Sequence, residues 1–136
     1  MAVKMSWEYV AGFFDGEGCV HMSHGGRCKT YVSLTQTQDR GMRLLREIQR
    51  FLIDEDMIHS HIGSFEKKNR TKTMHVLKIT KRSDVECFLL WVLPHVRIKK
   101  VETQDVLRYF KMFPQIELWD GARYHTPKGL RARIAA

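Results

Sequence analysis

Two acidic residues separated by one glycine are the first positions in this chain whose types and spacing suggest chemistry. Asp15 and Glu17 end the run Trp7 to Gly18, WEYVAGFFDGEG, and Gly16 stands between them. The first part of the run has helical spacing, and the glycines at its end predict that the helix breaks there. Glu17 is therefore expected to project a carboxylate from the C-terminal end of a helix. A helix end that delivers an acid to one fixed place is unusual.

One face of the predicted helix carries almost no side chain. Ser6 is a good N-cap, and Trp7, Val10 and Phe14 follow at i, i+3 and i+7 as one apolar stripe. The other face is made of small or charged residues: Glu8, Ala11, Gly12, Asp15 and Gly16. An interior glycine costs about 1 kcal/mol of helix stability relative to alanine. Two glycines four residues apart therefore predict that another backbone approaches this face closely.

The strong positive charge of the chain favours a nucleic-acid partner. Twenty-three lysines and arginines against fifteen acids give a net charge of +8 and a pI near 9.6. A basic domain of another kind, or a membrane-surface protein, is the alternative, and charge alone does not separate them. No basic amphipathic helix stands out to favour a membrane, and the longest apolar run, residues 88–93, is too short to span one.

Length and cysteine content predict a single intracellular domain. The 136 residues suffice for one domain with its own core. Three cysteines are too few and too unpatterned for a disulfide framework. No signal peptide is expected, because residues 1–6 lead straight into the helix. We therefore expect an intracellular protein, in the cytoplasm or nucleoid or in an organelle.

The rest of the chain alternates hairpins with helices. A period of two after the first helix predicts strands on both sides of the Gly25-Gly26 turn. The elements predicted, in order, are strands at 19–23 and 29–38, a helix at 40–53 capped by Asp39, strands at 62–68 and 73–80, a helix at 83–93 opened by the capping box Ser83 to Glu86, and a helix at 99–112. We assign residues 1–120 to one α+β domain and residues 121–136 to a basic C-terminal tail.

Each hairpin predicts a surface for polar contacts. The first has one apolar face, with Val20, Met22, Val32 and Leu34. Its other face carries hydrogen-bonding side chains: Cys19, His21, Ser23, Lys29, Tyr31, Ser33 and Thr35. The second hairpin is the most basic stretch of the chain, and its pattern leaves open which register faces the core. Its outward cations are predicted to be Lys67, Lys68, Arg70 and Lys72.

A zinc site in the first hairpin is an alternative metal hypothesis. Cys19, His21, His24 and Cys28 are all of types that bind zinc. Cys19 and His21 are side by side on one strand, however, and the spacings match no common zinc motif. The sequence therefore favours ordinary strand and turn residues over a zinc site here.

The nine residues Val10 to Gly18, VAGFFDGEG, resemble the LAGLIDADG motif of the homing endonucleases. They match it in type at every position: a large aliphatic residue, Ala-Gly, two large apolar residues, an acid, a small residue, an acid and Gly. The predicted order of elements also resembles the αββαββα homing-endonuclease fold over residues 6–112. The resemblance implies an α+β fold in which antiparallel strands form a saddle for DNA and the motif helix lies at a dimer interface.

The resemblance also implies a homodimer with a shared metal site, because one motif supplies half of an active site. In this family the motif helices pack through their small residues, which assigns the interface to Glu8, Ala11, Gly12, Asp15 and Gly16. The second acid of the motif binds metal, which assigns Glu17, with Gly16 beside it, to the metal site. Two such carboxylates repel each other without a cation between them, and oxygen ligands next to phosphate suit Mg²⁺ or another divalent cation such as Mn²⁺. Asp15 is expected to accept hydrogen bonds in a structural role.

Two further catalytic residues carry over by position from homodimeric members of the family. A glutamine near the end of the second strand and a lysine before the last core helix surround the metal-bound water there. Gln38, in TQTQD, and Lys99, in PHVRIKK, match these positions, and Lys100 replaces Lys99 if the register shifts by one. Without the resemblance, Gln38 is a strand-end residue and the lysines are a solvated helix start. Glu17, Gln38 and Lys99 are thus the predicted catalytic residues.

The predicted function is that of a site-specific double-strand DNA endonuclease. As a homodimer it would hydrolyse phosphodiester bonds in a long pseudo-palindromic target and leave short 3′ overhangs, with both hairpins in the major groove. Two alternatives use the same scaffold: a maturase that binds intron RNA, and a DNA-binding protein that does not cleave. The acid at Glu17, together with Gln38 and Lys99, argues against the second alternative.

Overall fold

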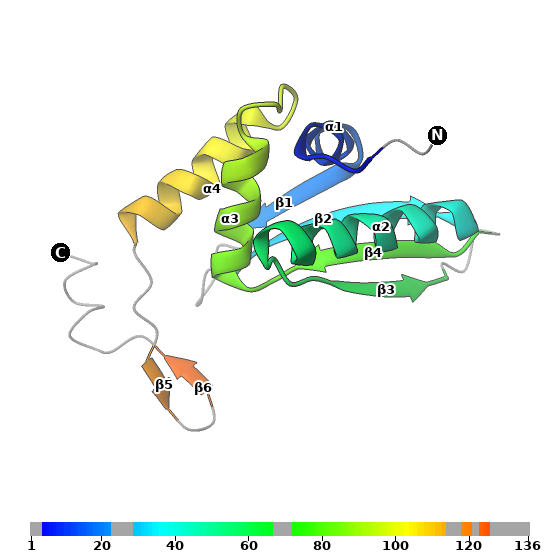
Figure 1. Ribbon diagram of the computed structural model, residues 1–136. Coiled ribbons are helices and arrows are strands. Elements are labelled where there is room, and N and C mark those ends of the chain that lie inside the picture. The colour runs from blue at the N-terminus through cyan, green and yellow to red at the C-terminus, as the bar shows by residue number, and fades with distance from the viewer. Residues whose placement is uncertain (1–3, 23–28, 67–71, 114–117, 121–122, 126–136) are drawn as a thin grey trace.

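The computed structural model describes residues 4–22, 29–66, 72–113, 118–120 and 123–125 (Figure 1). Some positions assigned above lie outside these ranges: Ser23, His24, Cys28, Lys67, Lys68, Arg70 and most of the basic tail. The elements are α1 (Trp7–Glu17), β1 (Gly18–Met22), β2 (Thr30–Thr37), α2 (Gln38–Asp56), β3 (His61–Phe65), β4 (Met74–Ile79), α3 (Arg82–Val92), α4 (Lys100–Met112), β5 (Leu118–Asp120) and β6 (Arg123–His125).

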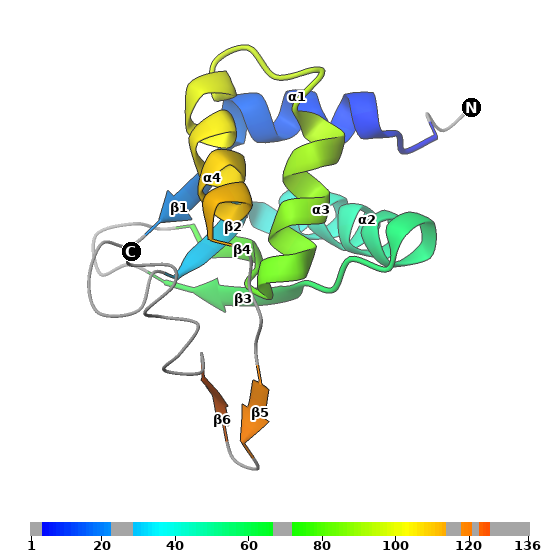
Figure 2. The same ribbon diagram turned by 90° about the vertical axis from the view of Figure 1, so that its left-hand side faces the viewer.

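Strands β1 to β4 form one antiparallel sheet in the order β1-β2-β4-β3. The two hairpins therefore meet along β2 and β4 at the centre of the sheet. With the helices after each hairpin, this arrangement confirms the predicted α+β class and the αββαββα order. Helices α1, α2 and α3 all pack on the sheet (Figure 2).

The hydrophobic core lies between these helices and one face of the sheet. Val32 and Leu34 of β2 and Leu77 and Ile79 of β4 are fully buried there. The helices contribute their own fully buried side chains: Val10, Ala11, Phe14, Leu45, Ile48, Leu52, Val85, Phe88, Leu89 and Val92. Because side chains alternate along a strand, the opposite face of the sheet holds the other residues, and no helix of the described part of the chain covers it (Figure 1).

The register of the second hairpin, which the sequence leaves open, is set by β4. His75, Leu77 and Ile79 are buried against the helices, whereas Met74, Val76 and Lys78 lie on the open face. His75 is accommodated in the covered layer because its Nδ1 forms a 2.7 Å hydrogen bond with Ser64 Oγ on β3. The buried imidazole of His75 thus has a hydrogen-bond partner, as buried polar groups generally do.

Helix ends follow the predictions only in part. Ser6 caps α1, since its Oγ accepts a hydrogen bond from the Tyr9 N–H at 3.2 Å. The Asp39 cap is wrong: the N-cap of α2 is Thr37, and Asp39 lies in the first turn. The capping box at Ser83 is also wrong. Helix α3 begins at Arg82, so Ser83 lies in its first turn and not at the N-cap. The neighbouring Asp84 is instead buried and accepts a hydrogen bond from the His59 N–H at 3.3 Å.

A small hairpin of β5 and β6 follows α4, with Leu118 paired to His125. Regular structure therefore continues past residue 120, where the basic tail is predicted to begin, and the domain boundary itself stays a prediction. None of the helices in the described ranges has the length and apolar character needed to cross a membrane.

Candidate active site and nucleic-acid interface

Helix α1 is anchored to the rest of the chain through its apolar side. Val10 and Phe14 are fully buried, and the Trp7 indole N–H donates a 2.9 Å hydrogen bond to the Asp56 carboxylate at the end of α2. The Trp7 ring also stacks on Trp91 of α3, with ring centroids 5.4 Å apart and planes within 5°. These contacts fix both the position and the rotation of α1, so its other side points in a defined direction.

Ala11 belongs to the buried side of α1. It was assigned to the dimer interface on the basis of the motif, but it is fully buried inside the single chain. Each helix residue is rotated by about 100° from the one before it, so Ala11 follows Val10 around the helix to the edge of the core. This part of the interface prediction is corrected: Ala11 is a core residue of the protomer.

The glycine-bearing side of α1 is open. Glu8, Gly12 and Gly16 are exposed, and a Cβ atom built at either glycine would meet no other heavy atom within 4 Å. The fold of one chain therefore does not require glycine at either position. The bare surface is available for a close approach from outside the protomer, as the sequence predicts.

Gly18, in contrast, is required by the fold. A Cβ atom at this position would lie 2.5 Å from Phe14 Cδ1 and 2.9 Å from Leu34 Cδ2, both core side chains. Its N–H donates to the Phe14 carbonyl and closes α1, and the chain enters β1 directly. This tight turn sets the direction of Glu17, the last residue of the helix.

Glu17 is exposed at the C-terminal end of α1. Within the described residues, no hydrogen bond or ion pair engages its carboxylate. The last carbonyls of a helix carry partial negative charge, which adds to that of the acid. An unengaged carboxylate beside helix carbonyls is a donor set that fits a hard divalent cation, with Glu17 and the backbone at Gly16 as its holders.

Asp15 holds the loop between α3 and α4 against the end of α1. Its carboxylate accepts hydrogen bonds from the backbone N–H groups of Arg97, at 3.0 Å, and Lys99, at 2.9 Å. Partial burial tends to raise the pKa of Asp15, but the N–H donors of Lys99, Arg97 and Ile98 and the Lys99 charge outweigh it and lower the pKa below its ordinary value. The carboxylate is therefore ionised at neutral pH and holds this loop within one chain; its place at a dimer interface stays a prediction.

Lys99 is brought to the same end of α1. Its ammonium group donates a 2.7 Å hydrogen bond to the main-chain oxygen of Asp15, two residues before Glu17. Lys100, the alternative, is exposed at the first position of α4. The structure thus favours Lys99 over Lys100 as the lysine of the candidate site, although the two are adjacent in sequence.

Two glutamines lie where β2 passes into α2: Gln36 is in the strand and Gln38 is the first residue of the helix. Gln38 is exposed and has a φ of 65°, a left-handed conformation that residues other than glycine adopt rarely. Gln36 is half-buried and has the strand parity of Val32 and Leu34, which face the helices. It packs against Gly41, where an added Cβ atom would lie 2.7 Å from Gln36 Cβ. Because Leu34 pairs with Gly18, the junction of β2 and α2 that carries both glutamines lies near the end of the motif. The sequence analysis singled out only Gln38, and strand alternation could not separate the two, because residues 36 and 38 have the same parity; the end of β2 at Thr37 separates them.

The open face of the sheet carries the predicted polar set of the first hairpin. The cross-strand pairs Cys19–Ser33 and His21–Tyr31 place these side chains together, with Thr35 further along β2. Lys29 is exposed immediately before β2, and Lys72 is exposed two residues before β4. Lys78 is a cation on this face that sequence reasoning missed, because it could be placed only once the register of β4 was known.

No zinc site is assembled by the described residues. In those ranges no three side chains of histidine, cysteine, aspartate or glutamate gather closely enough to hold a metal ion. Cys19 Sγ and His21 Nδ1 are 3.9 Å apart on the open face, while His24 and Cys28 fall in the undescribed segment.

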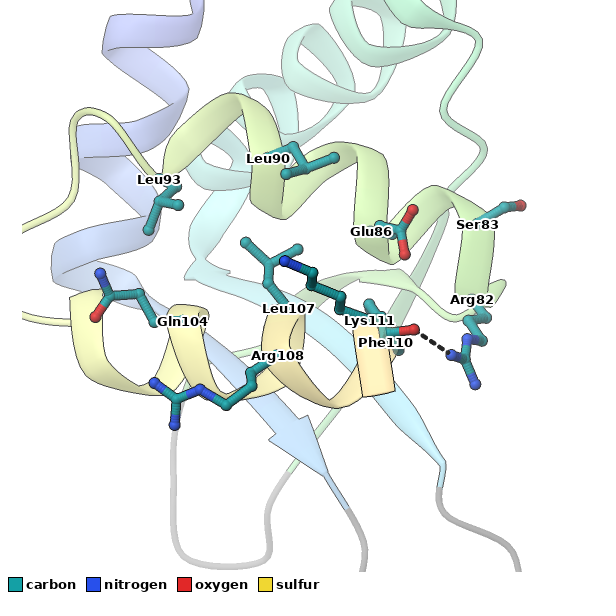
Figure 3. A pocket seen from close by; sticks show the side chains of 10 residues that line it. All are labelled: Arg82, Ser83, Glu86, Leu90, Leu93, Gln104, Leu107, Arg108, Phe110 and Lys111. Atoms are coloured by element: carbon teal, nitrogen blue, oxygen red, sulfur yellow. Dashed lines mark hydrogen bonds between the residues drawn. The ribbon is translucent and has the colours of Figure 1, made fainter. Parts of the chain in front are cut away.

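A cavity of about 870 Å³ lies between α3 and α4, on the helical side of the molecule (Figure 3). Leucines form much of its lining, and Arg82 at one end donates a 3.4 Å hydrogen bond to the Phe110 carbonyl. Neither Glu17 nor Lys99 lines it. The cavity is therefore separate from both the end of α1 and the open face of the sheet.

Comparison with known proteins gives one family and several solved structures of similar fold. A family model described as a LAGLIDADG-like domain matches residues 5–90. The structure of the homing endonuclease I-CvuI in complex with its target in the presence of Ca is similar with a TM-score of 0.62 and 20% identity, covering 80% of this chain and 68% of that chain. The archaeal intron-encoded homing endonuclease I-Vdi141I, complexed with DNA, gives 0.59 and 19%, covering 78% and 67%.

The LAGLIDADG meganuclease I-AabMI, bound to uncleaved DNA, is similar over 96% of this chain and 44% of its own, with a TM-score of 0.51 and 20% identity. A search of curated protein sequences finds no match. At these identities the structural matches show a shared fold, and the family model, which spans more than half of the chain, shows the family. The chain belongs to the LAGLIDADG-like domain family and has the fold of the LAGLIDADG homing endonucleases.

Proposed function

We propose that this protein is a metal-dependent DNA endonuclease that acts as a homodimer on a long, pseudo-palindromic duplex. The observation that carries the proposal is the end of α1: an exposed, unengaged Glu17 on a helix whose glycine face is open, with Lys99 fixed beside it. The structures of I-CvuI and I-Vdi141I, which have a similar fold, contain DNA, and this supports DNA as the substrate here. The I-CvuI structures were determined in the presence of Ca or Mg, and this supports a divalent cation.

The open face of the sheet would bind the duplex. Four antiparallel strands present hydroxyl, imidazole, phenol and ammonium groups, which can meet both base edges and phosphates. Two protomers joined along the glycine faces of α1 would place two such sheets on one duplex. A long target with related halves follows from that symmetry.

The end of α1 would carry out the cleavage. A bound divalent cation supplies an activated water and stabilises the leaving 3′ oxygen in phosphodiester hydrolysis. Glu17 and the backbone at Gly16 would hold it, and symmetry would bring the partner's copy of this acid to the same place. Cutting of both strands across the minor groove, with short 3′ overhangs, is the outcome proposed for the dimer.

Lys99 would stabilise negative charge on the scissile phosphate. Its ammonium group has three N–H donors, of which the contact with the Asp15 oxygen uses one. The two Asp15 carboxylate bonds to the loop backbone hold the lysine in place without using its side chain. A cation fixed before the reaction begins stabilises developing charge with little reorganisation.

The test of the proposal is cleavage of defined DNA. The genomic sequence flanking the reading frame, joined as an empty insertion site, is incubated with the protein and Mg²⁺. We expect a double-strand break at one position, loss of cutting with EDTA and recovery with added Mg²⁺ or Mn²⁺. If the DNA stays intact and the protein instead binds the surrounding intron RNA tightly, the maturase interpretation replaces this one.

Replacing Lys99 by methionine is expected to lower the single-turnover cleavage rate by about 100-fold, the loss typical when one fixed charge-stabilising donor is removed. DNA affinity and the melting temperature should change little, since the Asp15 carboxylate bonds go to backbone N–H groups that remain. Lys100→Met is the matched control and should cut at nearly the wild-type rate. If both variants lost cleavage rate equally, the result would contradict a specific role of Lys99 at the scissile phosphate.

A further inference from the structure

The four strands of the main sheet contain no acidic residue. Their sequences are GCVHM, TYVSLTQT, HIGSF and MHVLKI. The titratable groups on the open face are therefore neutral or cationic: Cys19, His21, Tyr31, Lys78 and His61. No carboxylate on these strands is present to neutralise or pair with them.

Four of these side chains form one connected row across the sheet. The His21 and Tyr31 rings stack with centroids 4.7 Å apart and planes within 19°. Lys78 Nζ lies 5.1 Å from the centroid of the same Tyr31 ring. His61 on β3 is the direct cross-strand partner of Lys78. The row thus runs from the edge strand β1 through both central strands to the edge strand β3.

We infer that His21, Tyr31, Lys78 and His61 form a single DNA contact in which binding of the duplex draws protons onto both histidines. The inference rests on the proposed function, because it takes the open face as the DNA-binding surface. It adds a property that a polar sheet does not have by itself, namely an affinity for DNA that depends on pH near neutrality.

The charges around each histidine give the direction of the effect. His21 faces Cys19 on its own strand, Tyr31 and the nearby Lys29 from β2, and Lys78 beyond the Tyr31 ring. His61 faces Lys78 from β4. In the unbound protein these lysines make the surroundings of both imidazoles positive. DNA phosphates reverse the local potential and favour the imidazolium forms.

Linkage then requires that acidification strengthen binding. If the duplex binds the imidazolium form of one histidine about ten times more tightly than its neutral form, the association constant rises about tenfold between the alkaline and acidic limits. The same linkage requires that complex formation take up protons near neutral pH. Both quantities are measurable on the wild-type protein, in Ca²⁺ or without divalent metal, so that the duplex is not cut.

The experiment measures the dissociation constant of the insertion-site duplex at several pH values between about 5.5 and 8, at fixed ionic strength. Calorimetry in buffers of different ionisation enthalpy counts the protons taken up. We expect tighter binding at low pH, and a smaller pH dependence in each of His21→Gln and His61→Gln. Lys78→Met should weaken binding and reduce its salt dependence by about one phosphate contact.

His59→Gln is the matched control, because His59 is exposed outside the strands, next to Asp84 of α3. It should keep the full pH dependence. Tight duplex binding with no proton uptake, or a pH dependence that survives in the double variant of His21 and His61, overturns the inference and leaves the endonuclease proposal standing. Failure to bind the duplex at any pH overturns both.

Discussion

Replacing Glu17 by glutamine should abolish DNA cleavage while leaving DNA binding intact. The amide has the shape of the carboxylate but no charge, so two copies of it at the dimer axis would no longer hold a divalent cation. We expect the single-turnover rate to fall by about a thousandfold or more, the scale of losing the principal electrostatic contribution to a phosphoryl-transfer reaction. The rate is measured on a labelled insertion-site duplex, and the affinity on the same duplex in Ca²⁺.

The exposure of Glu17 makes this a clean test. Its carboxylate has no partner among the described residues, so the free energy of unfolding should change by no more than about 0.5 kcal/mol. Glu47→Gln, at an exposed glutamate of α2, is the control for loss of one negative charge and should cut normally. Cleavage by Glu17→Gln at a rate near that of the wild type would remove the proposed metal site from the end of α1.

The parts of the site that local periodicity can encode were predictable. In β1 and β2 one face is apolar and the other polar, so a period of two places Val32 and Leu34 in the core and Tyr31, Ser33 and Thr35 outside. The helical spacing of Val10 and Phe14 likewise defined the buried side of α1. In these elements one choice of face is clearly better than the other, which is why sequence and structure agree.

In β4 the two faces are chemically alike, and the prediction had no basis for a choice. The strand MHVLKI alternates His75, Leu77 and Ile79 with Met74, Val76 and Lys78, and each set contains apolar residues and one basic residue. The burial of His75 depends on Ser64, eleven residues away on β3. Lys78 became part of the candidate DNA surface only through this pairing.

Contacts between distant segments were also beyond the sequence. Asp15 binds backbone groups of Arg97 and Lys99, which lie 82 and 84 positions further along the chain. The N–H groups that donate to a carboxylate depend on how α3 and α4 pack against α1, and no local pattern records that. The resemblance to a known motif supplied Lys99 as a candidate, whereas the hydrogen bonds explain why Lys99 rather than Lys100 reaches the end of α1.

Replacing Gly12 by leucine should convert the dimer into a monomer and abolish double-strand cleavage without unfolding the protomer. A Cβ atom at Gly12 meets nothing within 4 Å in one chain, and leucine forms helix better than glycine, so α1 should gain up to about 1 kcal/mol of stability. If two α1 helices meet backbone to backbone at this face, the leucine side chains must separate them. Sedimentation velocity and cleavage are measured on the same preparation.

Stability and assembly are thereby predicted to change in opposite directions, which distinguishes an interface from a merely exposed helix. Gln104→Leu adds the same side chain to the exposed surface of α4 and should remain dimeric and active. A Gly12→Leu protein that stays dimeric and cuts both strands would show that the dimer forms elsewhere. A wild-type protein that is monomeric even on DNA would exclude an active site shared by two Glu17 residues, since one chain contains Glu17 once.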